Sequence, residues 1–332
     1  MYLPPILQMV HICYPILAVF GLPANVLTII ILSRGNCGLS KCIGAYMMIM
    51  AVSDLSVIII NVVLYETLIY RLSHTFLHRT NLLLAIVYLM IVSLELSQWY
   101  TVAFTVDRYV TMCCQKFKTK YCRVKTVKIL AAVILILLSL EHIPYLFVFQ
   151  PLRIIGNTSW GIEFRLEAFY SPAYVAFTRL KSFQSLFCVF GLMFLFNGLT
   201  VRHILVSSKS RRGFQNQMNE NRRDKKMESR RNSIILLFSV SGSFMLLWLP
   251  AIVTNFIAGQ AMYSDRDYTS PAYIAAQTGA LLAHLSSCTN TYIYAATQTK
   301  FREELKTLLM SPWTFVLALA KKRAPWNQSF LS

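Results

Sequence analysis

The chain has 332 residues, of which 56% are hydrophobic and only 14% are charged. A soluble domain carries about 25% charged residues, so this composition excludes one and predicts a protein that lives in lipid. The net charge of +18 falls in short basic blocks between apolar runs. That pattern is typical of membrane loops and argues against nucleic acid as a partner. The first eight residues have no basic region, which predicts no cleaved signal peptide.

Seven apolar segments are each long enough to cross the hydrocarbon core as a helix. In chain order they cover about residues 9–33, 41–69, 82–112, 124–149, 172–206, 233–260 and 272–297. A shorter segment, about 299–310, repeats apolar residues at helical spacing and predicts an amphipathic helix on the membrane surface. The predicted fold class is an all-α membrane protein, a seven-transmembrane helix bundle over residues 1–310 with a short tail, 311–332.

The basic residues predict the orientation of these spans. Of the 32 Lys and Arg, 25 fall on the side that holds the tail and 7 fall on the other side. The positive side of a membrane protein is cytosolic, so the N-terminus is expected outside and the C-terminus inside. Asn157 opens the sequon Asn-Thr-Ser in a predicted outer loop and is the expected glycosylation site. The polar linker 207–232 is expected to be flexible and cytosolic. None of the eight cysteines falls in a predicted outer loop, so no external disulfide is expected.

Span two carries Asp54 near its middle. A carboxylate at that depth must face the bundle interior, a cation or a water-filled cavity, and a neutral hydrogen-bonded Asp is the alternative. Asn25 in span one and Asn290 in span seven are amides that would extend a polar network between helices. The alternative is that each amide only makes an ordinary hydrogen bond between helices, which the sequence pattern does not distinguish from a network.

Span three ends in Asp107-Arg108-Tyr109. A period of 100° per residue puts Arg108 on one stripe with Met90, so Arg108 faces the bundle. An arginine that snorkels to the lipid headgroups is the simpler alternative. In span six, Pro250 lies two residues after Trp248 and six residues after Phe244. It removes a backbone hydrogen bond, which predicts a kink and a candidate hinge.

Glu95 in span three lies about 20 Å further out than Arg108 and points off the main stripe. It lies too deep to snorkel, and a buried carboxylate needs a cation or a proton. Lys181 at the outer end of span five is the expected partner, and Glu141-His142 stand in the outer third of span four. The two charges either hold opposite ends of a zwitterion such as an amino acid, with Trp248 as an apolar wall, or form a structural ion pair.

Taken together, these residues resemble the rhodopsin-like G-protein-coupled receptors. The motifs that carry the resemblance occur in order, each on its own span: Asn25, Asp54, Asp107-Arg108-Tyr109, Trp248-x-Pro250 and Asn290-x-x-x-Tyr294. The stretch from Gly21 to Thr28 is most similar to a small orphan subgroup that includes receptors proposed to sense aromatic amino acids.

The resemblance implies a role for each matched residue. Asp54 would anchor a sodium-linked network with Asn25 and Asn290, and Trp248 would act as the pivot of activation, next to Phe244 and Pro250. Asp107, Arg108, Tyr109, Asn290 and Tyr294 would serve coupling to the G-protein. The implied partners are an extracellular ligand, a heterotrimeric G-protein, membrane lipids and arrestin, at the plasma membrane. The resemblance implies no cofactor, no firm metal site beyond possible sodium at Asp54, and no enzymatic activity.

Several positions depart from the family pattern. Leu83 stands where the outer-end cysteine of span three belongs, so the customary disulfide is absent. Thr291 and Val189 replace prolines of spans seven and five, and Arg230 stands where many members carry an acid that holds the arginine. A less tightly held resting state and basal activity are therefore expected.

The ligand is narrowed by exclusion. Met90 stands where amine receptors carry an Asp, and His284 stands where an opsin carries its retinal lysine. Both positions join Glu95, Lys181 and Trp248 in the expected ligand pocket. Ala251 replaces a base expected in the aromatic-amino-acid subgroup. The leading hypothesis is a receptor for an extracellular ligand such as an amino acid or a small peptide, which activates G-proteins by outward movement of span six. One alternative is a non-signalling receptor-like scaffold. Another is a channel or transporter.

Overall fold

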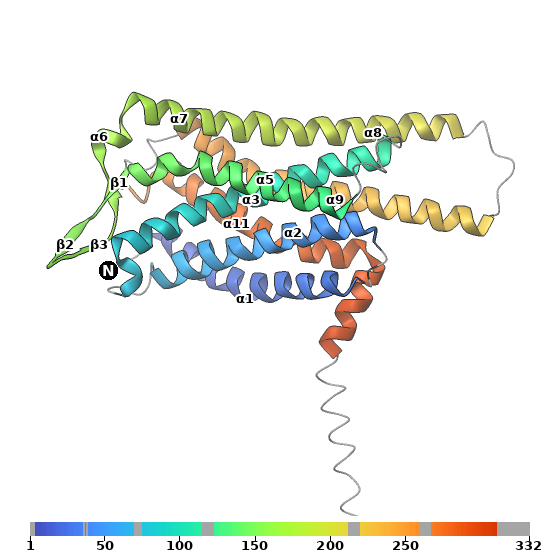
Figure 1. Cartoon of the computed structure of the whole chain (residues 1–332), viewed down its shortest axis with the longest axis horizontal. Coiled ribbons are helices and arrows are strands. Elements are labelled where there is room, and N and C mark those ends of the chain that lie inside the picture. The colour runs from blue at the N-terminus through green and yellow to red at the C-terminus, as the bar shows by residue number, and fades with distance from the viewer. Residues whose placement is uncertain are drawn as a thin grey trace, which may run out of the picture.

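Long helices lie side by side and form an elongated bundle in the computed structural model of the chain (Figure 1). The structure describes residues 4–35, 37, 39–69, 75–114, 123–211, 220–258 and 267–310, with the backbone alone for 207–211 and 220–230. Short β-strands lie at one end of the bundle, where α1 also begins. We call this end the β end, and the opposite end, where α3 finishes, the Arg108 end.

The helices follow the order of the predicted spans. Their bounds are α1 Pro5–Arg34, α2 Lys41–Val57, η1 Ile58–Ile69, η2 Phe76–His78, α3 Thr80–Cys113, α5 Val124–Glu141, η3 Ile143–Phe147, α6 Leu166–Phe169, α7 Pro172–Phe183, η4 Gln184–Phe190, α8 Gly191–Arg211, α9 Glu220–Ala258 and α11 Pro271–Thr297. A further helix covers residues 299–310. The segments η1 and η4 are π-helical, whereas η2 and η3 are 3-10 helices.

Local sequence explains where several helices begin and end. Ser171-Pro172 and Ser270-Pro271 start α7 and α11, where each serine accepts a backbone N–H in the first turn and each proline stands where its missing N–H costs nothing. Gly35 ends α1 with φ of 72°, a left-handed conformation that glycine adopts readily. Pro144 stops the α-helical pattern after Glu141, and the chain continues as the 3-10 helix η3.

Six stretches of the described residues are long and apolar enough to cross a membrane: Pro5–Arg34, Lys41–Ile69, Thr80–Cys113, Val124–Phe147, Pro172–Val206 and Arg231–Ile257. The seventh helix of the bundle, α11, packs against α1 and α9. Its buried face is polar, which explains why it is less apolar than the others; that face includes His284, Ser286, Ser287, Asn290 and Thr291. The chain is therefore a seven-helix membrane bundle, as the sequence predicts.

The structure corrects two sequence expectations. The fourth predicted span, 124–149, ends early, because Phe149 already belongs to a β-strand. The linker 207–232 was expected to be flexible, yet α8 continues to Arg211 and α9 begins at Glu220. Arg, Lys, Glu and Gln are good helix formers, so helices extend beyond the apolar spans. Residues 259–260 of the sixth predicted span and the tail 311–332 lie outside the described residues.

The apolar core has separate clusters along the bundle. One at the Arg108 end gathers Met47, Phe104, Leu237, Tyr294 and Phe301, which are almost fully buried. A second cluster joins α3, η4, α8, α9 and α11 and contains Phe244 and Trp248. Polar side chains lie between these clusters, so the middle of the bundle is not a continuous hydrocarbon core.

Two antiparallel β pairs form the connection between η3 and α6. Strand β1 (Phe149–Gln150) pairs with β4 (Glu163–Phe164), and β2 (Arg153–Ile155) pairs with β3 (Thr158–Trp160). Gly156, with φ of 61°, lies in the two-residue turn of the β2–β3 hairpin. These strands add a small β element to a fold expected to be all-α.

Hydrogen bonds attach the hairpin to the start of α3. The Thr80 hydroxyl donates to the Gly161 carbonyl and the Gly161 N–H donates to the His78 carbonyl, each at 2.7 Å. Below this contact Leu83 is buried in an apolar cluster against which Ile162 packs. The seven cysteines in the described part of the chain are free thiols. Hydrogen bonds and apolar packing therefore hold this connection at the position where the related receptors use a disulfide.

We predict that Gly161→Ala lowers the melting temperature of the detergent-solubilised protein more than Gly156→Ala does. Both glycines have positive φ, which costs an L-residue about 1–2 kcal/mol. At Gly161 an added Cβ would also lie 2.9 Å from Leu152 Cβ, whereas it would meet nothing within 4 Å at Gly156. Thermal melts followed by size-exclusion chromatography measure the difference. Equal shifts in the two variants would contradict the role given to Gly161.

Candidate functional site

Arg108 lies buried near the end of α3, with 2% of its surface exposed. Its guanidinium pairs with the carboxylate of Asp107 and lies 5.5 Å from the centre of the Phe104 ring. Cys42 of α2 donates to the other Asp107 oxygen at 3.4 Å. The Arg108 Nε has no hydrogen-bond partner among the described residues. The arginine is therefore held inside the bundle by its own helix, as its place on the inward stripe predicts, and does not snorkel outward.

Tyr109 follows this arginine in the chain, and Tyr294 belongs to the apolar cluster that contains Phe104. The Tyr109 ring packs on Phe196 of α8, with 5.2 Å between ring centres. Tyr294 is almost fully buried and meets Phe301 of the 299–310 helix edge-on at 5.9 Å. The Tyr294 hydroxyl has no hydrogen-bond partner among the described residues. A buried hydroxyl without a partner costs stability, so Tyr294 would gain by moving to a polar position. The side chain of Arg230 lies outside the described residues.

Asp54 joins three helices at the centre of the bundle. Its two carboxylate oxygens accept from Ser97 Oγ of α3 at 2.6 Å and from Asn290 Nδ2 of α11 at 2.7 Å. Asp54 itself is 1% exposed. A carboxylate offers about four lone-pair sites, so these two donors leave it room for a cation or water. The structure therefore brings together Asp54 and Asn290, as the polar pattern predicts.

Asn25 forms a separate contact and is not bonded to Asp54. Its Nδ2 donates to the carbonyl oxygens of Gly21 at 3.1 Å and Ser287 at 2.9 Å, so it ties α1 to α11. One turn further along, the hydroxyls of Thr28 and Thr291 lie 2.8 Å apart. Thr291 thus makes an interhelical hydrogen bond at the position where the family pattern has a proline. Polar contacts in a bilayer must be satisfied within the protein, and these serve that need.

Phe244 and Trp248 stack on one face of α9, with 5.7 Å between ring centres. Pro250 lies inside the same helix. Opposite it, a Cβ added to Gly279 of α11 would lie 2.7 Å from Ala251 Cα, so α9 and α11 touch closely next to the proline. The geometry combines a missing backbone hydrogen bond with a close helix contact, which is what a pivot between the two halves of α9 requires.

Glu95 and Lys181 meet at the interface of α3, α5 and α7. Lys181 Nζ lies 2.7 Å from one Glu95 oxygen and 3.2 Å from a Glu141 oxygen, and His142 Nε2 lies 3.2 Å from the other Glu95 oxygen. The pairing of Glu95 with Lys181 expected from the sequence is therefore present. The sequence reasoning did not assign Glu141 and His142 to this cluster, although Pro144 three residues on marks the helix end that positions them.

The other three residues of the expected ligand pocket lie in different surroundings. Met90 packs between α3 and η1, and Trp248 belongs to the α9 cluster. The His284 ring meets Tyr14 of α1 edge-on, its Nδ1 lies 2.7 Å from the Ala280 carbonyl, and its Nε2 has no partner among the described residues. Sequence reasoning missed the contact with Tyr14, for which no local pattern gives a signal.

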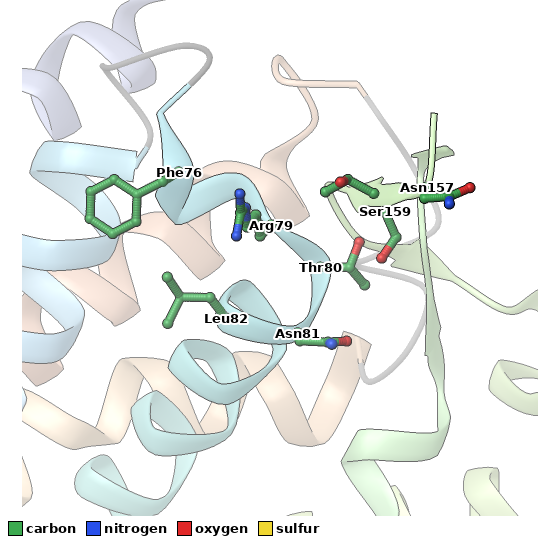
Figure 2. Close-up of a pocket in the computed structure, with 8 residues that line it drawn as sticks. Phe76, Arg79, Thr80, Asn81, Leu82, Asn157 and Ser159 are labelled. Atoms are coloured by element: carbon green, nitrogen blue, oxygen red, sulfur yellow. The ribbon is translucent and has the colours of Figure 1, made fainter. Parts of the chain in front are cut away.

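A hollow of about 430 Å³ opens at the β end, between the start of α3 and the β2–β3 hairpin (Figure 2). None of the five residues expected in the ligand pocket lines it; the lining includes Phe76, Arg79, Thr80 and the hairpin residues Asn157 to Ser159. In Figure 2 the exposed Asn157 side chain points away from the α3 residues. The expected glycosylation site is therefore open to solvent.

The fold and these contacts define a multi-pass membrane protein with a buried carboxylate at its centre and a buried arginine at one end. The profile of the seven-transmembrane receptor (rhodopsin) family matches residues 24–294 of the chain. The chain belongs to that family. Family membership suggests a receptor and not an enzyme.

A named relative is the probable G-protein-coupled receptor npr-8 of Caenorhabditis elegans. It is 27% identical over 86 residues, which is 26% of this chain and 18% of the relative. The chain thus matches less than a fifth of that relative's length, and the narrower orphan subgroup stays a prediction.

Proposed function

We propose that this protein is a plasma-membrane receptor that binds an extracellular ligand and activates heterotrimeric G-proteins. The observation that carries the proposal is the burial of Arg108 at one end of the bundle, held by Asp107 of the same helix. The 25-to-7 distribution of basic residues supports a cytosolic Arg108 end and an outside N-terminus. The β end, with its hairpin and its hollow, would then face the outside.

In this proposal activation moves α9 outward at the Arg108 end. The close contact of Gly279 with Ala251 and the nearby Pro250 would fix the pivot, and the stacked Phe244 and Trp248 would transmit the motion. The opened space would let Arg108 exchange Asp107 for a backbone carbonyl or carboxylate of the G-protein. Tyr294, whose hydroxyl has no hydrogen-bond partner in the described part of the chain, would turn toward that space with Asn290 beside it.

We further propose that sodium binds at Asp54. The carboxylate and the Ser97 hydroxyl supply hard oxygen ligands, which suit a small hard cation. Asn25 Oδ1 is buried and has no hydrogen-bond partner among the described residues, which supports a polar ligand such as water or a cation in this region. When bound, the ion supplies positive charge to a carboxylate that joins three helices.

For the ligand we propose an amino acid or a small peptide. Its ammonium would take the place of Lys181 on Glu95, and its carboxylate would bind the Lys181 ammonium that this exchange releases. His142 would continue to face Glu95, and Glu141 would continue to face Lys181. Met90, Trp248 and His284 are proposed as further parts of the pocket.

Arg108→Ala should abolish G-protein activation, or reduce it at least about tenfold, at equal surface expression. The reason is that Arg108 is the strong base on the inward stripe of α3 and lies buried at this end of the bundle. G-protein dissociation in cells, measured by energy transfer with and without candidate ligands, tests the prediction. Arg34→Ala, an exposed base at the same end of the bundle, is the matched control and should signal normally. Undiminished signalling by Arg108→Ala would contradict the role proposed for Arg108. Absence of signalling in the unaltered protein would favour a non-signalling receptor-like scaffold.

Glu95→Gln and Lys181→Met should each weaken the potency of an amino-acid or peptide agonist by at least about tenfold, or roughly 1.4 kcal/mol. Each change removes one of the two charges that would bind the ends of the zwitterion. Dose–response curves against a panel of amino acids and short peptides provide the measurement. Glu163→Gln changes an exposed carboxylate in β4 and should leave potency unchanged. Loss of surface expression with unchanged potency would identify a structural ion pair.

Asn157→Gln should remove the whole size shift that glycosidase treatment produces. Asn157 is exposed in the hairpin turn on the side proposed as extracellular. Asn327→Gln changes the other sequon, in the proposed cytosolic tail, and should have no effect. Gel mobility before and after glycosidase treatment decides the point, and staining of an N-terminal tag in intact cells checks the orientation. A size shift that survives Asn157→Gln would contradict the glycan assignment.

A further inference from the structure

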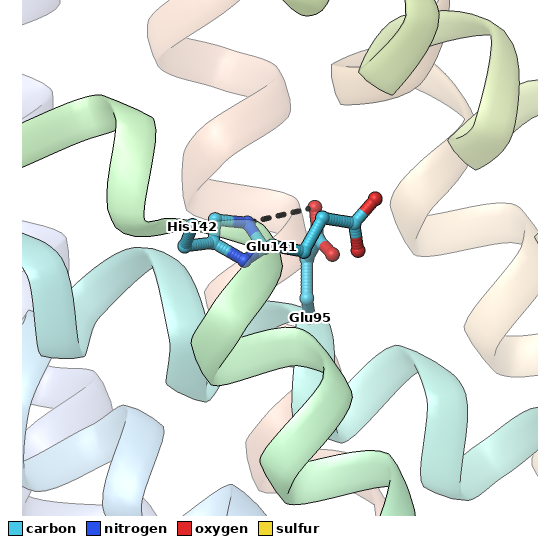
Figure 3. A group of neighbouring side chains, drawn as sticks. All are labelled: Glu95, Glu141 and His142. Carbon is cyan, nitrogen blue, oxygen red and sulfur yellow. Dashed lines mark ion pairs between the residues drawn. The ribbon is translucent and has the colours of Figure 1, made fainter.

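Three side chains capable of binding a metal ion meet near the outer third of the bundle (Figure 3). Glu95 comes from α3, Glu141 is the last residue of α5, and His142 caps that helix before Pro144. One ligand atom from each lies within 4.8 Å of the others. In a tetrahedral zinc site, bonds of about 2.0–2.2 Å place ligand atoms roughly 3.3–3.6 Å apart. The cluster therefore needs a contraction of only about 1 Å, which rotation of the glutamate side chains supplies.

His142 is oriented as a metal-binding histidine is. Its Nδ1 lies 2.8 Å from the carbonyl oxygen of Leu138, and because a carbonyl accepts only, Nδ1 carries the hydrogen. Tyr145 stacks on the ring at 5.5 Å and fixes its plane. A backbone partner on one ring nitrogen is the common arrangement that leaves the other nitrogen free to bind a metal.

The second ring nitrogen, Nε2, has no hydrogen-bond partner among the described residues. The His142 side chain is fully buried, and its Nε2 points at a Glu95 oxygen 3.2 Å away without forming a hydrogen bond of acceptable geometry. Figure 3 shows the ring turned toward this carboxylate. A cation bound between Nε2 and this oxygen would be a partner for both atoms.

The balance of charge in the cluster also favours a bound cation. Glu95 and Glu141 carry two negative charges, and Lys181 supplies one positive charge. Two carboxylates therefore share one ammonium in a setting where the Glu95 side chain is only 13% exposed. Burying an uncompensated charge is costly, so the site favours a further cation.

We propose that Glu95, Glu141 and His142 form a binding site for Zn²⁺, and that the Lys181 ammonium holds the position of the cation when the metal is absent. One imidazole nitrogen and two carboxylate oxygens are ligands that zinc prefers, and they leave a fourth position for water. Glu141, about a third exposed, gives the cluster its opening to the surroundings. Because zinc and Lys181 compete for the same two carboxylates, the ammonium must move aside when zinc binds.

Zinc at this site would also regulate the receptor. It would occupy Glu95, which the proposed ligand needs for its own ammonium, so it would lower agonist potency. This consequence rests on the proposed function, whereas zinc binding itself does not. The two are separated by measuring binding directly on purified protein.

The test is zinc titration of the purified full-length chain in detergent, by competition with a fluorescent zinc chelator. Glu141→Gln is the primary variant because Glu141 is partly exposed and its carboxylate contacts Lys181 alone among the ion pairs of the described residues. It should weaken zinc binding at least tenfold, as should His142→Gln. Lys181→Met should tighten binding at least threefold, because it removes the competing ammonium. Glu163→Gln and His78→Gln, which change residues at the β end, should bind zinc as the unaltered protein does.

Opposite changes in zinc affinity in the two variants distinguish a metal site from a cluster of salt bridges. Weaker binding in Glu141→Gln together with tighter binding in Lys181→Met supports the proposal. If His142→Gln does not fold, Glu141→Gln and Lys181→Met still decide the question. Equal zinc affinity in all variants, or no saturable binding in the micromolar range, would overturn it and leave a proton on His142 as the balancing charge. Failure of signalling with zinc binding intact would refute the receptor proposal alone.

Discussion

The hydrogen-bonded carboxylate of Asp54 is the constraint around which the helices are arranged. In a bilayer no water satisfies buried polar groups, so a carboxylate at this depth must find its donors within the protein. Ser97 of α3 and Asn290 of α11 supply them, which fixes the rotation of two helices relative to α2. The polar face of α11 follows from the same requirement. That face lowers the apolarity of the helix, and the protein gains a central network that joins three helices.

Two further ionic groups lie on either side of this network and differ in how they are held. Arg108 pairs with its neighbour in sequence, so the contact places no demand on another helix and is easily exchanged. The cluster of Glu95, Glu141, His142 and Lys181 instead joins α3, α5 and α7. A bundle with a local ion pair at one end and an interhelical cluster toward the other suits a protein that opens at one end while it senses a charged species near the other. Cross-helix charge clusters of this kind specify arrangement more than they add stability.

The connection between the bundle and the β2–β3 hairpin shows how the fold compensates for a missing covalent link. Leu83 packs where the related receptors have a cysteine, and Ile162 covers it. Thr80 and His78 hold Gly161 through hydrogen bonds to its backbone. Gly161 suits this place because its φ is positive and its missing side chain leaves room for Leu152. Hydrogen bonds of this kind contribute about 1 kcal/mol each, less than a disulfide, so the hairpin is held reversibly.

The sequence by itself determined the membrane class and the seven-helix bundle. In lipid, an apolar run of spanning length satisfies its backbone hydrogen bonds by forming a helix. It also predicted that Asp54 faces inward, because a carboxylate at that depth needs a partner, and that Arg108 does, because helical phase is a local property. For Arg108 a snorkelling side chain was the alternative. The sequence also predicted the pairing of Glu95 with Lys181 and of Asp54 with Asn290, but only the tertiary structure decided the remaining partners. Asn25 bonds to Ser287 and not to Asp54, and Glu141 and His142 join Glu95, because the angle between packed helices and the break at Pro144 set these contacts. Contacts between distant segments depend on packing geometry, which no local pattern encodes.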